Sequence, residues 1–185
     1  MSSLHRRQFR LATLLVAVAI VVWWGYEHWR SHRFDKLIAA AASRYQLEPG
    51  LVKAVIWRES RFNPGARGRA GELGLMQIRE AAAIEWAGAE HLKGFDHAAC
   101  LDPATNILSG AWYLKKALGR YPRADDPTPF ALADYNAGRG NVLKWQTGPA
   151  ATNSQAFLGQ VQFPSTRDYI RAIMRRADRY HGDFN

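Results

Sequence analysis

Apolar residues recur along most of the chain at the spacing of an α-helix. After Pro103 four of them follow at positions i, i+4, i+7 and i+11 and so share one helix face: Ile107, Ala111, Leu114 and Leu118. Asp102 and Pro103 are residue types that favour the N-cap and the first turn of a helix. No stretch alternates apolar and polar residues over a convincing strand length. The pattern predicts an all-α protein without internal repeats.

Helix-forming composition and terminal Pro and Gly signals predict further helices. They cover residues 34–46, the segment opened by Pro49, residues 79–89, Pro129 to Gly138, and a segment from about Ser165. In the last of these, the inner face is formed by Ile170, Ile173, Met174 and Ala177, and a solvated face by Arg171, Arg175 and Arg179. The Gly-rich residues 62–74 and the polar residues 146–163 are predicted as loops.

The N-terminus combines a basic segment with an apolar run. Three arginines precede sixteen uncharged residues, Leu11 to Tyr26. As a helix this run spans about 24 Å, somewhat less than the roughly 30 Å of a bilayer core. The positive-inside rule then predicts a cytoplasmic N-terminus and an exported body. We therefore predict two parts: a basic N-terminus with a transmembrane anchor in residues 1–33, and a folded domain in residues 34–185.

A cleaved signal peptide is the alternative for this segment. Cleavage requires small residues after the apolar run, whereas "VVWWGYEHW" offers bulky ones. A buried helix of a soluble protein fits poorly with the Arg-rich flank and the paired Trp. An uncleaved signal anchor is the favoured interpretation.

The net charge of +9 favours an anionic binding partner but does not identify it. A basic surface suits an anionic polymer, which includes nucleic acid, lipid headgroups and cell wall. No nucleic-acid recognition motif accompanies the charge. The single cysteine, Cys100, cannot form an internal disulfide and no Cys/His spacing suggests a metal site, so we expect a buried thiol and neither metal nor cofactor.

One acid stands in an unusual place, within "VIWRESRFNP". Leu51, Val55 and Glu59 fall at i, i+4 and i+8, so Glu59 continues an apolar helix face in the last turn of its helix. Burial and the negative end of the helix dipole both disfavour the anion and raise the pKa of this carboxyl. A carboxyl that stays protonated near neutrality suits a general acid. The alternative is a surface ion pair with Arg58 or Arg61.

Five short segments in order resemble the signature of the family 1 lytic transglycosylases, which have a goose-type lysozyme-like fold. They are "ESRFNP", "GLMQI" at 74–78, "DPATNILSGAWYL" at 102–114, "DYNAG" at 134–138 and "TRDYI" at 166–170. The resemblance covers roughly residues 40 to 180. It implies cleavage of the β-1,4 bond between N-acetylmuramic acid and N-acetylglucosamine in peptidoglycan, with the muramyl 6-hydroxyl closing a 1,6-anhydro ring.

By this resemblance Glu59 is the catalytic acid that protonates the glycosidic oxygen and then acts as base for the 6-hydroxyl. Ser60 matches the serine that supports it. Gln77 matches a glutamine that lines the cleft near the acid, and Met76 shapes the cleft. The anchor and the substrate together imply a bacterial inner-membrane protein whose catalytic domain lies in the periplasm.

The resemblance also assigns Tyr135 and Asn136 to substrate binding on the facing helix, and Tyr169 to the far wall. Each residue has a structural alternative. The two tyrosines could be core aromatics, and Gln77 and Asn136 could be capping or turn residues.

Several positions depart from the family pattern. Gly68 stands where a serine near the acid is frequent, Glu72 where alanine is frequent, Arg79-Glu80 where Met or Thr precedes Pro, and Ser165 where Glu is frequent. Glu72 is a second carboxylate on the loop that faces the acid. It could activate water, as paired carboxylates do, or pair with Arg67 or Arg69.

The sequence is compatible with three functions. The first is the anchored lytic transglycosylase. The second is a hydrolytic muramidase, such as an exported phage endolysin, that uses Glu59 together with Glu72. The third is a glycan-binding scaffold that has kept the fold without the activity.

Overall fold

The computed structural model describes residues 3–184, and within them every regular element is a helix. Two compact units divide the chain, Met1–Phe34 and Asp35–Asn185. The first holds α1 (Ser3–His32), whose stretch from Leu11 to Val22 exposes its apolar side chains. By length and composition α1 can cross a membrane, a property that a signal sequence shares.

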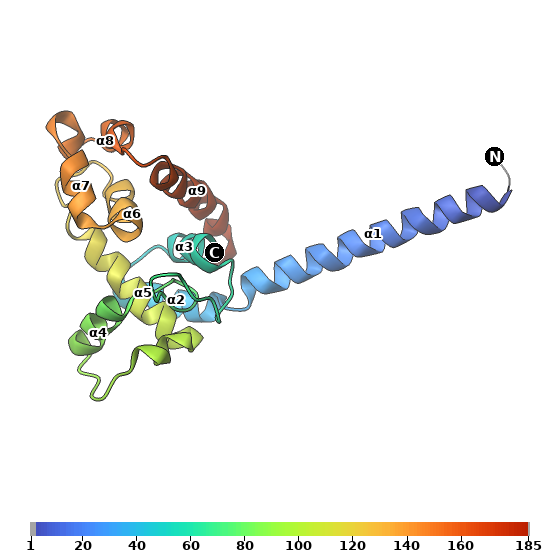
Figure 1. Cartoon of the computed structure of the whole chain (residues 1–185), viewed down its shortest axis with the longest axis horizontal. Coiled ribbons are helices and arrows are strands. Elements are labelled where there is room, and N and C mark those ends of the chain that lie inside the picture. The colour runs from blue at the N-terminus through green and yellow to red at the C-terminus, as the bar shows by residue number, and fades with distance from the viewer. Residues whose placement is uncertain (1–2, 185) are drawn as a thin grey trace. The chain divides into compact units, whose positions relative to one another are not determined.

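The second unit, the folded unit, is built from eight α-helices and three short 3-10 helices among the described residues (Figure 1). In order they are α2 (Asp35–Tyr45), α3 (Pro49–Ser60), α4 (Glu80–Ala89), η1 (His97–Leu101), α5 (Pro103–Leu118), α6 (Thr128–Ala137), α7 (Arg139–Trp145), η2 (Gly148–Ala151), α8 (Ser154–Gln160), α9 (Pro164–Tyr180) and η3 (His181–Phe184).

Helix α3 lies at the centre of this unit, and α9 packs along it (Figure 1). Residues 50–56 of α3 are all buried, Lys53 among them. The Lys53 ammonium pairs with Asp35 at 2.7 Å and Asp183 at 2.7 Å, so a buried charge fastens α2 and the C-terminus to α3. The central helix is thereby fixed on several sides, which makes its last turn a firm place for a functional side chain.

The helix starts follow their sequence signals. Asp102 caps α5 by accepting the Thr105 N–H at 2.8 Å, with Pro103 in the first turn as predicted. The predicted stripe of α5 is buried at Ile107, Ala111 and Leu114. Residues 62–74 form a loop whose only ladder contacts, within the described part of the chain, are isolated bridges. Cys100 is buried, as expected.

The prediction of a loop over residues 146–163 is wrong. Two helices lie there, η2 and α8, and α7 comes directly before them. Asn153 starts α8 by accepting the Ala156 N–H at 2.8 Å. The apolar residues of this region are few, but Ala150, Phe157 and Leu158 are buried, and Phe157 stacks on Phe130 of α6. Tertiary packing stabilises helices that are too short to be stable alone.

Candidate active site

Glu59 lies in the last turn of α3, at the edge of a cleft. The helix ends because Arg61 takes a left-handed conformation with φ of 52° and donates its N–H back to Trp57. Phe62 follows with φ of 62° and is buried. The two consecutive left-handed residues turn the chain sharply away, so the carboxyl of Glu59 is left facing the cleft rather than a continuing helix.

The partner of Glu59 is Tyr169 of α9, whose phenol donates a hydrogen bond of 2.5 Å to Glu59 Oε1. Among the described residues Glu59 forms no ion pair, so the surface pairing with Arg58 or Arg61 is absent there. Its other oxygen, Oε2, has no partner within the same residues. One oxygen is therefore held and the other is available to the cleft.

Burial raises the pKa of the Glu59 carboxyl above its ordinary value, and the charge of Glu72 adds to the rise. The Tyr169 hydrogen bond and the Arg58 charge act in the opposite direction. Burial also raises the pKa of the Tyr169 phenol far above its usual range, with Glu59 as the next cause. Tyr169 therefore remains a hydrogen-bond donor, and Glu59 keeps its proton to a higher pH than an exposed glutamate.

The loop from Leu73 to Ile78 is held by one buried side chain, Asn106 of α5. Its Oδ1 accepts the Met76 N–H at 2.7 Å, and its Nδ2 donates to the Leu73 carbonyl at 2.8 Å and the Cys100 carbonyl at 2.7 Å. All three partners are backbone groups, so the Asn106 amide supplies hydrogen bonds that a neighbouring strand would otherwise provide. In the sequence Asn106 stands within a family motif, and nothing there indicates this role.

Gln77 follows Met76 in this loop with φ of 50°. Its side-chain Nε2 donates to the Gly74 carbonyl at 2.9 Å and the Ala66 carbonyl at 3.2 Å. These bonds close the loop, and the amide oxygen stays available at the cleft. Gln77 thus combines the turn role and the cleft-lining position that the sequence left as alternatives.

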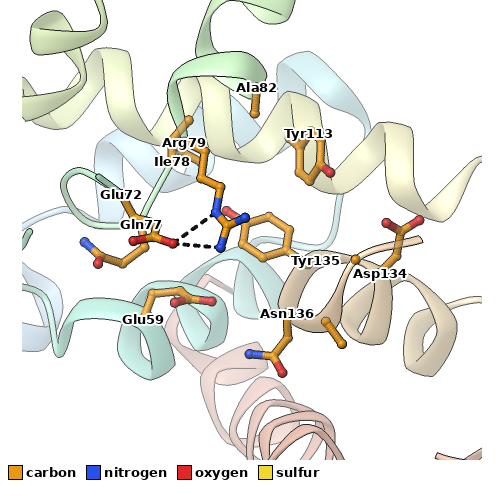
Figure 2. A pocket seen from close by; sticks show the side chains of 12 residues that line it. Glu59, Glu72, Gln77, Ile78, Arg79, Ala82, Tyr113, Asp134, Tyr135 and Asn136 are labelled. Atoms are coloured by element: carbon orange, nitrogen blue, oxygen red, sulfur yellow. Dashed lines mark hydrogen bonds and ion pairs between the residues drawn. The ribbon is translucent and has the colours of Figure 1, made fainter. Parts of the chain in front are cut away.

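Helix α6 brings Tyr135 and Asn136 to the opposite wall of the cleft (Figure 2). The Tyr135 phenol donates to the Met76 carbonyl at 2.8 Å and ties α6 to the loop. Burial raises the pKa of Tyr135 well above its ordinary value, so it stays a donor. Asn136 Oδ1 accepts the Thr166 hydroxyl at 2.8 Å, which turns its amino group toward the cleft as a donor.

Glu72 stands at the cleft wall, but its carboxylate is occupied. Oε2 accepts the Ala70 N–H at 3.0 Å, while Oε1 lies 3.0 Å from Arg79 Nε and 2.9 Å from Arg79 Nη2 (Figure 2). The predicted pairing with Arg67 or Arg69 is wrong, because the loop turns Glu72 toward Arg79 instead. Partial burial alone would raise the pKa of Glu72. The backbone donors and Arg79 outweigh it and hold this pKa below its ordinary value.

Gly68 makes room for this arrangement. A Cβ at Gly68 would lie 2.2 Å from Glu72 Oε2, so any side chain there would displace the carboxylate. Gly68, Glu72 and Arg79 all depart from the family pattern, and the structure brings the three together. They form one cluster at the cleft wall, although nothing in the sequence indicates that they meet.

The cleft has a volume of about 300 Å³. Its walls come from α3, from the loop between α3 and α4, and from α4, α5 and α6. The lining residues are Glu59, Glu72, Gln77, Ile78, Arg79, Ala82, Tyr113, Asp134, Tyr135, Asn136, Ala137 and Gly138. Sequence reasoning gave no site role to Tyr113, Arg79 or Asp134. Nothing in the sequence singles out Asp134 beyond its place in a helix. Its carboxylate is buried and accepts hydrogen bonds from Arg120 and Tyr121.

Three predicted site residues do not line the cleft. Met76 is fully buried, and its side chain would be 2.3 Å from a Cβ at Gly110. The Ser60 hydroxyl donates to the Ile56 carbonyl of its own helix at 3.2 Å. Tyr169 is buried and reaches the site only through its hydrogen bond to Glu59. Among the described residues, no three carboxylate, His or Cys ligand atoms meet in the cleft to hold a metal.

Comparison with known proteins fits this geometry. The family model of the transglycosylase SLT domain matches residues 36–158. The chain belongs to the SLT domain family. A relative of this SLT domain is the membrane-bound lytic murein transglycosylase F of Desulfosudis oleivorans, 36% identical over 116 residues, which are 61% of this chain and 24% of the relative. The chain thus spans about a quarter of that relative's length.

Solved SLT structures agree in fold. An inactive Glu-to-Gln mutant of lytic transglycosylase Slt from Pseudomonas aeruginosa is 25% identical, with a TM-score of 0.74 over 81% of this chain and 24% of that one. A complex of the 70-kDa soluble lytic transglycosylase with bulgecin A is 25% identical, with a TM-score of 0.75 over 97% of this chain and 29% of that one. The predicted family and its all-α, lysozyme-like fold are confirmed.

Proposed function

We propose that this chain is a membrane-anchored lytic transglycosylase. It cleaves the β-1,4 bond between N-acetylmuramic acid and N-acetylglucosamine in peptidoglycan and leaves a 1,6-anhydro ring. The observation that carries the proposal is Glu59: a half-buried carboxyl with a raised pKa, one oxygen held by Tyr169 and the other available to a cleft of about 300 Å³.

Glu59 acts first as the acid. Its proton passes to the glycosidic oxygen, the bond to the anomeric carbon breaks, and the N-acetylglucosamine side leaves as an alcohol. The carboxylate formed is stabilised by the Tyr169 phenol. The muramyl 6-hydroxyl then attacks the anomeric carbon and gives its proton to Glu59. The acid is regenerated and no water is consumed.

The amide side chains at the cleft orient the substrate. The Asn136 amino group can donate to an acetamido carbonyl, because its oxygen is already bonded to Thr166. The Gln77 oxygen can accept from a sugar hydroxyl or acetamido N–H, because its amino group is bonded within the loop. Tyr135 and Met76 keep the two walls together, while Ser60 secures the last turn of α3.

Two relatives support this assignment. The Pseudomonas aeruginosa structure is of an inactive mutant that lacks a single carboxylate, which fits a mechanism with one acid. The 70-kDa transglycosylase was solved in complex with bulgecin A, so we propose that the same compound binds this chain. We expect bulgecin A to raise the Tm of this chain.

Hydrolysis assisted by Glu72 is the second candidate, because Glu72 lines the same cleft as Glu59. The bonds from Ala70 and Arg79 count against it. They occupy both oxygens and lower the basicity that a water-activating carboxylate needs. The raised pKa of Glu59 counts against a scaffold without activity.

Muropeptide mass spectrometry separates these functions. Purified peptidoglycan is digested with the full chain and, in parallel, with Glu59→Gln. We expect products lighter by one water than reducing-end muropeptides, and their loss by a factor of about 10³ in the variant. Reducing-end products would establish a hydrolase. A wall that is bound but uncut would establish the scaffold.

For location, we propose that α1 anchors the chain in the bacterial inner membrane with the SLT domain in the periplasm. The apolar, exposed surface of α1, the arginines that precede its apolar run and a membrane-bound relative support this. Membrane fractionation with N-terminal sequencing is the test. We expect an intact N-terminus in the pellet, and a shortened soluble product would contradict the anchor.

A further inference from the structure

A second pocket lies between α3 and α9, apart from the cleft. Its volume is about 180 Å³, and its lining comes from both helices: Trp57, Ala172, Arg175, Arg176 and Arg179. Trp57 precedes Glu59 by two positions, which turns it about 200° around the helix axis. The pocket therefore opens on the side of α3 away from the acid and shares no residue with the cleft.

Trp57 forms the floor of this pocket and carries two guanidinium groups. Arg176 lies 4.0 Å from the centre of the indole, and Arg61 lies 3.9 Å from it. Two cations cannot share one face at such distances, so they occupy opposite faces of the ring. Stacking fixes the Arg176 guanidinium in place without using its hydrogen-bond donors.

The positive charge of the pocket is uncompensated. Within residues 3–184, Arg175, Arg176 and Arg179 form no ion pair, and neither Asp168 nor Asp178 of the same helix pairs with them. Arg175 and Arg179 are exposed beside Arg176. The Nε of Arg176 is buried and lacks a hydrogen-bond partner among the described residues. This Nε is not accessible from the pocket, so an oxyanion there would bond to the terminal nitrogens of the guanidinium, Nη1 and Nη2.

We propose that this pocket binds the phosphate group of anionic phospholipid headgroups. The guanidinium fork matches two oxygens of a phosphate, and several arginines supply the countercharge. A tryptophan beside arginines is also the combination found at the level of the headgroups. The sequence assigned Arg175 and Arg179 to a solvated face, and the proposal gives that face a ligand.

This inference rests on the proposed anchor in one respect. Only Arg33 and Phe34 separate the end of α1 from the start of α2, so a chain that is anchored by α1 keeps its folded unit at a membrane surface. The stem-peptide carboxylates of peptidoglycan are the other anions nearby. They reach the cleft with the glycan, whereas this pocket faces away from it, so the headgroup is favoured.

The test uses the full chain in nanodiscs and hydrogen exchange of residues 171–180. Nanodiscs of phosphatidylcholine are compared with nanodiscs that contain phosphatidylglycerol. We expect exchange in this segment to slow about tenfold with phosphatidylglycerol. The double variant Arg175→Gln, Arg179→Gln keeps the Arg176 stack on Trp57 and should lose the difference. The matched control Arg123→Gln, Lys144→Gln removes two exposed charges outside the pocket and should keep it.

Each other outcome overturns the proposal. Equal exchange in both lipids means that the pocket does not bind the headgroup. Slowing by inorganic phosphate in phosphatidylcholine nanodiscs, without slowing by phosphatidylglycerol, assigns it to free phosphate. Slowing only when peptidoglycan is added assigns it to the wall. Failure of the chain to enter nanodiscs defeats the proposed anchor. Exchange is then measured with phosphatidylglycerol vesicles added to the chain in solution, and equal exchange with and without these vesicles overturns the headgroup proposal.

Discussion

Tyr169 and Glu59 are 110 residues apart in the sequence, yet the Tyr169 phenol donates to Glu59 Oε1 over 2.5 Å. The bond joins α9 to the last turn of α3 and stabilises the ionised carboxyl. Burial acts in the opposite direction and is the stronger influence, because the pKa of Glu59 is raised. The pH at which Glu59 loses its proton depends on the balance of these two effects.

Replacing Tyr169 with Phe should change the pH profile as well as the rate. The hydrogen bond lowers the pKa of Glu59, so its loss raises that pKa further and moves the alkaline limb of kcat/KM to higher pH. The carboxylate formed during the reaction also loses its donor, and the maximal rate should fall about 10- to 100-fold. Release of anhydro-muropeptides, measured against pH, reports both effects.

Tyr45→Phe is the matched control for this experiment, because its hydroxyl bonds to Glu90 and Trp86, and Tyr45 does not line the cleft. Its pH profile should equal that of the wild type. An alkaline limb that moves to lower pH in Tyr169→Phe would contradict the proposed role of the bond.

Glu72→Gln should move the alkaline limb the other way. The negative charge of Glu72 raises the pKa of Glu59, so its removal lowers that pKa and makes the acid lose its proton at lower pH. The 1,6-anhydro product should persist, because Arg79 and the Ala70 N–H already occupy the two oxygens of Glu72. The measurement is the same pH series with mass analysis of the products. If the wild type released reducing-end products and Glu72→Gln released anhydro products, the chain would be a muramidase that uses Glu72.

Asn106→Ala should destabilise the folded unit and lower activity together. The side chain makes hydrogen bonds to Met76, Leu73 and Cys100 from a fully buried position. Loss of all three leaves buried backbone groups unsatisfied and costs about 2–4 kcal/mol of unfolding free energy. Denaturant unfolding gives the loss directly. Asn141→Ala removes one bond, to the Ala137 carbonyl, and should cost about 1 kcal/mol or less.

Gly110→Ala tests whether the buried Met76 sets the position of the Gln77 loop. The added Cβ would lie 2.3 Å from Met76 Sδ, so the loop must shift and stability should fall by about 1–3 kcal/mol. Gly88→Ala is the matched control, because nothing lies within 4 Å of its added Cβ. Thermal unfolding and activity are measured for both. If Gly110→Ala behaves like Gly88→Ala, Met76 does not hold the loop.

The helix boundaries were largely predictable, because they depend on local chemistry. The signals at Asp102 and Pro103 work through bonds within one turn, and the α5 stripe works through its spacing. The segment from 146 to 163 was not predictable. Its helices exist because Phe157 finds Phe130 of α6, and that meeting depends on the whole fold.

The candidate site divides in the same manner. Position and periodicity alone placed Glu59 on an apolar face at a helix end, and the raised pKa follows from that. The partner of Glu72 could not be read from spacing, because Arg79 reaches it only after the loop closes. The role of Asn106 was equally out of reach, since its three partners come from two other segments.

The sequence by itself determined the helical class, the apolar N-terminal run, the family and the place of Glu59 on an apolar helix face. These depend on residue type and on spacing within one element. Only the tertiary structure decided that Tyr169 holds the acid, that Gly68, Glu72 and Arg79 form one cluster, and that arginines gather around Trp57. The physical reason is that hydrogen bonds and ion pairs act over only a few ångströms. Segments that are distant in the sequence come within that range only when the core is packed.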